Sequence, residues 1–517
     1  MTKVIKYVKE NIYVLILGFI TLWLRLVNLG YSDYQGDEIK AMFLPEEGQS
    51  VAEFLLTQRK GPVQFIITFL LKLVDPTYDH RFLMRLPFAI AGVLAVFSFY
   101  KLIRQYFSRK IAFFSAFFLA TNGFFVAFSR IIQYQSFVIM FMILALYFFT
   151  LAFKKESWKI KGLYLGFLAW SLSILSHYDG VFIGPFVLYT FYRWIKTYEI
   201  KTMGQFLKAF ILPSLMFTLL LCAFYIPFIL ELSKSTLSYW KGRIEGTGGK
   251  ISSSKYLFTV YQPIYVIHIY FALAVLGALR ILWKLFIHFK NKNWDRMFLY
   301  FSLGVWFVCA ITFMEFFVNI PGTHIYTYLI SLFWILGMGV MFIYELMKMI
   351  FSKIAFSDVL FWLGTGVVFL FIFAQSHQIF VEHGTEYPWR SEKFFVWEFP
   401  RPTPIFHLSI FGFPYYRHWD EIGEFVTNSE NNGYYSTNER KSIARYHIPF
   451  DKDTEEAGHF VYIRNPQSFT NKIIYEKADY WAKHYPPVLS FFKNGEPVVK
   501  VFYMPKGSLE EIQEQGF

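Results

Sequence analysis

Two adjacent carboxylates, Asp37 and Glu38, are the first residues along the chain whose types suit catalysis. They lie in a polar segment, 31–38, that directly follows an apolar stretch long enough to cross a bilayer. A carboxylate can accept the proton of an attacking hydroxyl group as a general base, and adjacent acids raise one another's pKa. An Asp-Glu pair is also common in ordinary loops, so its role depends on the elements that position it.

Other polar residues occur at the ends of apolar stretches. They are Arg25 and Lys60, which flank the acidic pair, and Arg130, Tyr134, His177, Asp179, His324 and Tyr326. Charge at membrane depth is costly, so such residues usually mark function. All of them map to one side of the expected bundle, which predicts a polar cavity open to the outer leaflet. It could bind a lipid-linked anionic headgroup, although any single member could be a solvated helix end.

The composition is typical of a membrane protein. The 517 residues are 55% hydrophobic and 22% aromatic, with only 17% charged, whereas about 25% is usual in soluble domains. These values exclude a disordered chain and a collagen-like rod. The two cysteines, Cys222 and Cys309, lie in apolar runs and cannot form a disulfide framework or a zinc cluster.

The apolar stretches predict an α-helical polytopic protein with about eleven transmembrane helices. They are 11–29, 84–103, 110–129, 131–153, 161–176, 179–195, 208–231, 263–288, 297–318, 322–348 and 356–376. The first is not a cleavable signal peptide, because it lacks a small-x-small cleavage site. We see no internal repeat of the kind found in many transporters.

The distribution of charge predicts the topology. Lysine and arginine cluster in alternate connections, beginning with Lys3, Lys6 and Lys9 at the N-terminus. Basic residues stay on the cytoplasmic side, so the N-terminus is expected inside and the tail outside, in an integral protein of a bacterial plasma membrane. The net charge of +13 is then a topology signal, and we expect no nucleic-acid partner.

The expected division is a transmembrane domain, 1–376, followed by an extracytoplasmic domain, 377–517. The first includes two long outer segments, an acidic one at 30–83 and one at 232–262 whose glycines and serines predict a mobile loop. Within 30–83, the run Val63–Leu73 predicts a helix lying against the membrane. Beyond Arg417 the pattern predicts a small α/β domain, with a helix at Asp420–Asn428 and strands at Gly433–Ser436, His459–Ile463 and Val498–Tyr503.

The order of these features resembles the GT-C membrane glycosyltransferases of the family that includes the protein O-mannosyltransferases and the lipid A aminoarabinose transferase (glycosyltransferase family 39). The matching elements over roughly 10–350 are Arg25, Asp37-Glu38, Lys60-Gly61-Pro62, Arg85-Leu86-Pro87, Arg130 and His177-Tyr178-Asp179-Gly180. The chain departs from the pattern at Gly61, where the family has proline, and at His177, where it usually has lysine. Gln133 and Gln135 stand where the aminoarabinose transferase has a functional carboxylate.

The resemblance implies transfer of a sugar, most simply a hexose, from a polyprenyl-phosphate donor to a protein, lipid or cell-surface glycan. It implies an inverting single displacement, with Asp37 as the base and Glu38 positioning it or the acceptor. A departing phosphate needs charge stabilisation rather than a general acid. We expect Lys60, Arg130 and Arg25 to bind it, with His177, Asp179, His324, Tyr134 and Tyr326 as further substrate-binding candidates.

Three alternatives remain at this stage. Asp37, Glu38 and a third oxygen ligand could hold a divalent ion, although we expect no metal and no other cofactor. A transporter or flippase for a lipid-linked anionic glycan would use the same cavity without chemistry. An inactive scaffold would use the outer domain to recruit a partner.

Overall fold

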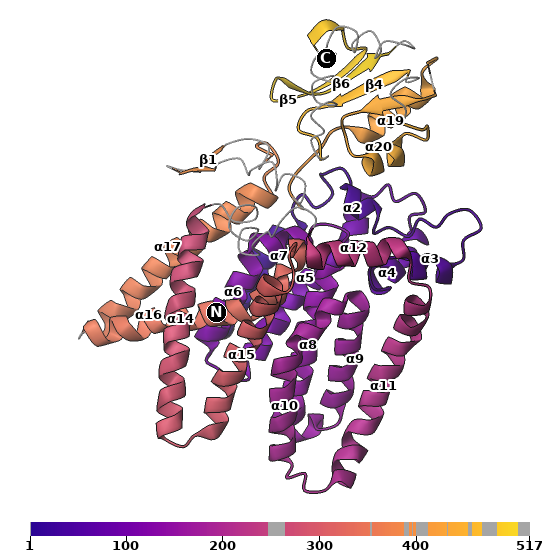
Figure 1. Cartoon of the computed structure of the whole chain (residues 1–517). Coiled ribbons are helices and arrows are strands. Elements are labelled where there is room, and N and C mark those ends of the chain that lie inside the picture. The colour runs from indigo at the N-terminus through magenta and orange to yellow at the C-terminus, as the bar shows by residue number, and fades with distance from the viewer. Residues whose placement is uncertain are drawn as a thin grey trace.

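The computed structural model describes residues 2–246, 264–351, 354–386, 392–394, 397–399, 412–431, 433–452, 458–467 and 483–504. A bundle of long helices carries several short helices at one end, and beyond these lies a small domain built on a sheet (Figure 1). The short helices include α2 (Gly36–Ile39), α3 (Val51–Thr57), α4 (Val63–Lys72) and α12 (Lys234–Glu245). The acidic pair therefore lies between the bundle and the small domain.

Every predicted apolar stretch contains a helix. The bundle helices are α1 (Thr2–Leu26), α5 (Arg81–Arg104), α6 (Arg109–Thr121), α7 (Gly123–Phe128), α8 (Gln135–Lys154), α9 (Lys161–Ser176), α10 (Gly184–Thr197), α11 (Met203–Leu230), α14 (Ile264–Lys290), α15 (Trp294–Phe316), α16 (Tyr326–Ile350) and α17 (Ile354–Phe380). Short 3₁₀ turns, η1 (Glu156–Trp158), η2 (Tyr178–Ile183) and η3 (Gly322–Ile325), join some of them.

Seven helices of the described chain are long and apolar enough to cross a membrane: α5, α8, α11, α14, α15, α16 and α17. The protein is thus an α-helical polytopic membrane protein, as predicted. The expected number of about eleven spans is not confirmed, because α9 and α10 have only 16 and 14 residues. The predicted span 110–129 is divided at Asn122, whose side chain accepts a hydrogen bond from the Phe124 amide and starts α7.

The helices differ in how much of their surface other protein elements cover. In α8 and α16, 78% of the most apolar window is buried inside the protein, against 11% in α11 and 22% in α17. Apolar side chains that remain exposed on α11 and α17, such as Leu219 and Leu363, suit contact with lipid. The first group forms the centre of the bundle and the second its lipid-facing surface.

The C-terminal domain confirms the predicted α/β class. Its four-stranded sheet has the order β3-β4-β6-β5, with β3 (Tyr435–Thr437) parallel to β4 (His459–Ile463), and with β6 (Glu496–Tyr503) antiparallel to β4 and to β5 (Leu489–Lys493). Helices α19 (Trp419–Asn428) and α20 (Lys441–His447) pack beside it. A separate hairpin joins β1 (Glu392–Phe394) to β2 (Trp397–Phe399).

The first outer loop and the C-terminal domain share a hydrophobic core. Tyr34, Met42 and Tyr78 from the loop pack in one cluster with Trp419 and Ile443 from the domain. The backbone also joins the two parts, because the Asp33 amide donates to the Tyr415 carbonyl and the Arg417 amide donates to the Asp33 side chain. The loop is therefore held from both sides, by the bundle below and the domain above.

The second outer segment differs from its prediction. The expectation of a mobile loop over 232–262 is wrong for its first part, which forms helix α12. Ser233 accepts a hydrogen bond from the Thr236 amide, an N-cap that the sequence Ser-x-x-Thr permits. The remainder, 247–262, lies outside the described residues.

Candidate functional site

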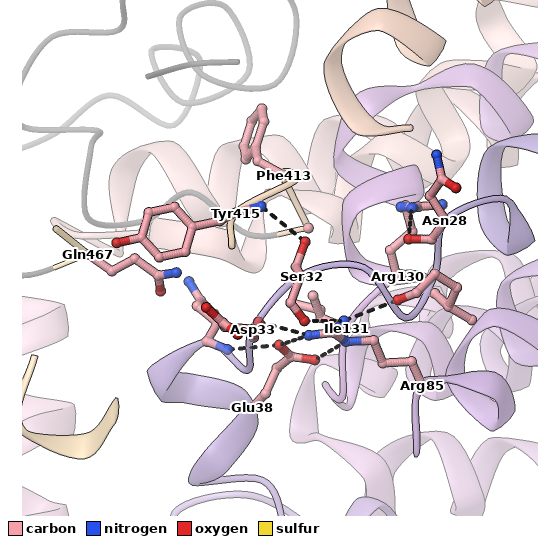
Figure 2. A pocket seen from close by; sticks show the side chains of 13 residues that line it. Asn28, Ser32, Asp33, Glu38, Arg85, Arg130, Ile131, Phe413, Tyr415 and Gln467 are labelled. Carbon is pink, nitrogen blue, oxygen red and sulfur yellow. Dashed lines mark hydrogen bonds and ion pairs between the residues drawn. The ribbon is translucent and has the colours of Figure 1, made fainter. Parts of the chain in front are cut away.

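Helix α2 places the two adjacent carboxylates in different environments. Glu38 is 1% exposed and pairs with Arg85 of α5, whose Nε lies 2.8 Å from Oε1 and whose Nη2 lies 2.9 Å from Oε2. Both oxygens also accept backbone amides, from Ile132 and from Gln35 at the start of α2. Figure 2 shows this bidentate pair at the floor of a pocket. Glu38 is thus fully occupied in fixing the loop.

Asp37 has a more open environment. Its side chain is 31% exposed, and Oδ1 lies 2.8 Å from Nη2 of Arg440, a residue of the C-terminal domain 403 positions further along the chain. Asp37 and Glu38 therefore pair with different arginines.

The close approach of the domain to α2 depends on Gly36. A Cβ atom at this position would lie 2.5 Å from Oγ of Ser442 and 2.9 Å from Cδ of Arg440. Real Cβ contacts are not that short, so any other residue at this position would force the side chains of Ser442 and Arg440 to shift. The Asp37–Arg440 pair is thus part of a tightly fitted contact.

Lys60 lies on the bundle side of Asp37. Its Nζ lies 3.0 Å from Oε1 of Gln133, and the amide nitrogen of the same glutamine donates to the Asp37 carbonyl at 2.5 Å. Lys60 also lies over the ring of Tyr134, 5.0 Å from its centroid. Burial lowers the pKa of Lys60 to about 8, although the negative charge of Asp37 acts in the opposite direction. The Gln133 side chain therefore links the backbone of Asp37, the predicted base, to the ammonium group of Lys60, the predicted phosphate ligand.

Gly61 explains one departure from the family pattern. A Cβ at this position would lie 1.8 Å from the carbonyl oxygen of Leu175 in α9. The loop after Lys60 therefore packs directly on the backbone of α9, where neither proline nor any other side chain fits. This contact fixes Lys60 relative to the turn that follows α9.

Arg25 and Arg130 bind the ends of helices. Arg25 donates to the Ala120 carbonyl at 2.9 Å, at the end of α6, and Arg130 donates to the carbonyls of Leu24 and Val27, at 3.0 and 2.9 Å, and of Asn28, at 3.1 Å, at the end of α1. Helix C-termini leave carbonyls without partners and favour nearby cations. Among the described residues neither arginine has a carboxylate partner. The carbonyls at these helix ends thus account for the burial of both arginines. Of the three predicted phosphate ligands, only Lys60 is linked to Asp37.

Arg130 and Glu38 line one pocket, and Lys60 is not among the described residues that line it. The pocket measures about 440 Å³, including the open solvent at its mouth, and lies where the first outer loop meets the C-terminal domain. It is lined by Asn28, Ser32, Glu38, Arg85, Arg130, Tyr415 and Gln467, among others. Figure 2 shows Tyr415 and Gln467 on the domain side and Arg85 and Glu38 on the bundle side.

The remaining candidates form one cluster beside Lys60. Asp179 is 1% exposed, and its Oδ2 accepts the Tyr326 hydroxyl at 2.5 Å and lies 2.6 Å from Nδ1 of His324 and 3.2 Å from Nδ1 of His177. The His177 ring stacks on Tyr134, with centroids 4.5 Å apart. Tyr134 joins this cluster to Lys60, because its ring contacts both His177 and the Lys60 ammonium group.

Sequence reasoning missed Arg440 as a site residue and gave Gln133 no role. Nothing local marks Arg440, because its partner is 403 residues away. Gln133 stood out only as a departure from the family pattern. Lys40 lies near the same groups: burial and then the positive charges of Arg440 and Arg59 lower its pKa, while Asp37 acts in the opposite direction. The site is thus one carboxylate among several cations.

Two solved structures share the fold of the chain. ArnT from Cupriavidus metallidurans, bound to undecaprenyl phosphate, is 11% identical, with a TM-score of 0.51 over 96% of this chain and 98% of that one. AglB from Archaeoglobus fulgidus, in complex with an inhibitory peptide and a dolichol-phosphate, is 12% identical, with a TM-score of 0.50 over 97% and 75%. The chain has the GT-C fold of membrane glycosyltransferases.

The family model described as dolichyl-phosphate-mannose-protein mannosyltransferase matches residues 60–222. This segment begins at Lys60 and includes Arg85, Arg130 and the His177 turn. The Pmt1-Pmt2 complex of S. cerevisiae, bound to the sugar donor, is 19% identical over 46% of this chain and 35% of that one, with a TM-score of 0.27.

The chain spans 65% of the archaeal oligosaccharyltransferase in its crystal structure with a tethered acceptor peptide, and 58% of the apo form, with TM-scores of 0.49 and 0.45. No curated protein matches the chain at the level of sequence.

Proposed function

We propose that this chain transfers a sugar, most simply a hexose, from a polyprenyl-phosphate donor to a protein, lipid or surface glycan on the extracytoplasmic face of a bacterial plasma membrane. The observation that carries the proposal is the link from Asp37 through Gln133 to Lys60. In this link the Gln133 side chain joins Nζ of Lys60 to the backbone carbonyl of Asp37, which supports a shared task for the two residues. The lipid phosphates bound by the ArnT and AglB structures support the choice of donor.

The reaction would be a single displacement with inversion at the anomeric carbon. Asp37 accepts the acceptor's proton as its oxygen attacks, and the bond to the donor phosphate breaks on the opposite face of the sugar. Lys60 holds the negative charge that grows on the departing phosphate. Glu38 takes no part in proton transfer or phosphate binding in this mechanism. Its side chain fixes α2 against Arg85.

Arg440 adds a condition to this mechanism. Its ion pair occupies Oδ1 of Asp37, so Oδ2 is the oxygen left to accept the proton. The pair is partly exposed, with side chains 31% and 26% accessible, so solvent screens it and it contributes little to stability. Through this pair the C-terminal domain orients the base.

The test is transfer by the full-length protein in detergent or vesicles, with a set of radiolabelled polyprenyl-phosphate hexoses and membrane extract as acceptor. We expect labelled product at similar rates with the wild type and with Glu47→Gln, which removes an exposed carboxylate of the same loop, and a rate lower by about a hundredfold or more with Asp37→Asn. A rate near that of the wild type in folded Asp37→Asn would overturn the proposal. Movement of intact donor across vesicles without product would indicate a flippase instead.

A further inference from the structure

A second cluster of potential ligands lies beside the proposed catalytic site. It consists of His177 and Asp179 in the turn between α9 and α10 and His324 in the turn before α16. One ligand atom from each lies within 4.8 Å of the others. His177 and Asp179 are 3% and 1% exposed, and the side chain of His324 is 16% exposed. The cluster is therefore nearly dry and opens on one side, at His324.

The charge of Asp179 lacks an ordinary counter-ion. Within the described parts of the chain, no lysine or arginine forms an ion pair with it, and its ionic contacts are the two histidines. Burying a carboxylate is costly unless a positive charge or several hydrogen bonds compensate it. The Tyr326 hydroxyl and the two histidines contact this carboxylate, and a cation held between it and both rings would add a full positive charge.

Neighbouring side chains hold His177 and Asp179 in place. Tyr134 stacks on His177, and the Tyr326 hydroxyl donates to Asp179. The turn itself is tightly packed, because a Cβ at Gly180 would lie 2.7 Å from Oγ of Ser173. Ordered partners that orient ligands are typical of metal sites.

The spacing suits a metal with short bonds. Zinc and similar ions bind histidine nitrogen and carboxylate oxygen at about 2.0–2.2 Å, which separates two ligand atoms by roughly 3.0–3.5 Å. The Oδ2 of Asp179 lies 3.2 Å from Nδ1 of His177, within that range, and 2.6 Å from Nδ1 of His324, which would have to move outward by a fraction of an ångström. Imidazole favours transition metals over magnesium or calcium.

We propose that His177, Asp179 and His324 hold one divalent transition-metal ion, of the zinc, cobalt or manganese kind. Three protein ligands leave at least one coordination position open, as in catalytic rather than structural zinc sites. The Tyr134 ring lies against both His177 and Lys60, so the ion adds positive charge one ring away from the proposed phosphate ligand. This site is distinct from an ion on Asp37 and Glu38, since Glu38 is occupied by Arg85.

The experiment measures binding alone, on the untagged full-length protein in detergent after treatment with a chelator. The probes are Zn²⁺, Mn²⁺ and Co²⁺, followed by elemental analysis after removal of free ion and, for Co²⁺, by visible absorption. The variants are Asp179→Asn and His324→Gln. The matched control is His288→Gln, which removes a histidine from the last turn of α14. Circular dichroism checks that each variant is folded.

We expect one ion per chain in the wild type and in His288→Gln, and at least a tenfold weaker affinity in each of the other two. Failure of all three ions to bind stoichiometrically, or unchanged binding in folded Asp179→Asn and His324→Gln, would overturn the proposal. The outcome is independent of sugar transfer: a protein that binds none of the three ions but transfers sugar would refute the site alone, and a protein that binds an ion but transfers no sugar would refute the proposed function alone.

Discussion

The two sides of helix α2 carry the same kind of ion pair in opposite surroundings. Glu38 is buried, and its two oxygens receive two guanidinium and two backbone donors. Asp37 is 31% exposed and receives one donor on one oxygen, from Arg440. A carboxylate with all its acceptor positions filled stabilises structure, whereas one with a free oxygen facing solvent can accept a proton. Adjacent acids in sequence thus have separate tasks.

A substitution at Asp37 tests most directly whether the two acids have different tasks. We expect Asp37→Asn to lower the rate of sugar transfer by about 10²–10⁴-fold, the usual contribution of a general base. The amide still accepts from Arg440, so the thermal unfolding temperature should stay near that of the wild type. Transfer rates and thermal unfolding in detergent check both statements. Loss of folding together with activity would give Asp37 the structural task assigned to Glu38.

Glu38→Gln should show the opposite pattern. It leaves the Arg85 guanidinium, which is 2% exposed, without a compensating charge, and breaking a buried pair in this way costs about 3–5 kcal/mol. We expect a large fall in thermal stability and in the yield of folded protein, while the molecules that do fold retain transfer. Glu47→Gln, on the exposed part of the same loop, is the control. A stable but inactive Glu38→Gln would contradict this assignment.

The sequence predicts the helices, the α/β class of the tail and most of the residues near the site, because apolar length and local patterns carry that information. It cannot predict which arginine pairs with which acid. Arg85 and Arg440 lie 47 and 403 residues from their partners, and only the packed fold brings them together. The same limit applies to Arg25 and Arg130, because the sequence does not reveal that both donate to carbonyls at helix ends.

One missed element was accessible from sequence alone. Strands β5 and β6 are joined at Asn494-Gly495, both with positive φ, at 52° and 77°. Asn-Gly between strand-like runs is the usual signal of a two-residue hairpin turn. Helix α20, in contrast, has no side-chain cap and is stabilised by its contact with the sheet and with α2, which no local pattern reveals.

The pH dependence of the donor KM tests whether Lys60 binds the donor phosphate. Burial lowers the pKa of Lys60 to about 8, so the free enzyme loses this charge as the pH rises through 8, while the donor phosphate stays anionic. We expect the donor KM to rise up to tenfold per pH unit above pH 8, with kcat less affected.

Two variants isolate the contribution of Lys60. Lys60→Arg keeps its charge at high pH and should flatten the profile, whereas Lys72→Arg, at the end of α4, should leave it unchanged. A rise in KM that persists in Lys60→Arg would assign the titration to another group.

Of these variants, Arg440→Gln should have the smallest effect on sugar transfer. It tests whether Arg440 only orients the Asp37 carboxylate. The Asp37–Arg440 pair is partly exposed, with side chains 31% and 26% accessible, so its loss should cost at most about 1 kcal/mol of stability. Transfer should fall only a few-fold, since Asp37 keeps its proton-accepting oxygen and loses only a guide to its position. Arg440→Lys should recover part of this loss, because a point charge can still pair with Oδ1 without the planar geometry of arginine. An effect as large as that of Asp37→Asn would mean that Arg440 contacts the substrate itself, and the C-terminal domain would then contribute a catalytic residue rather than a positioning one.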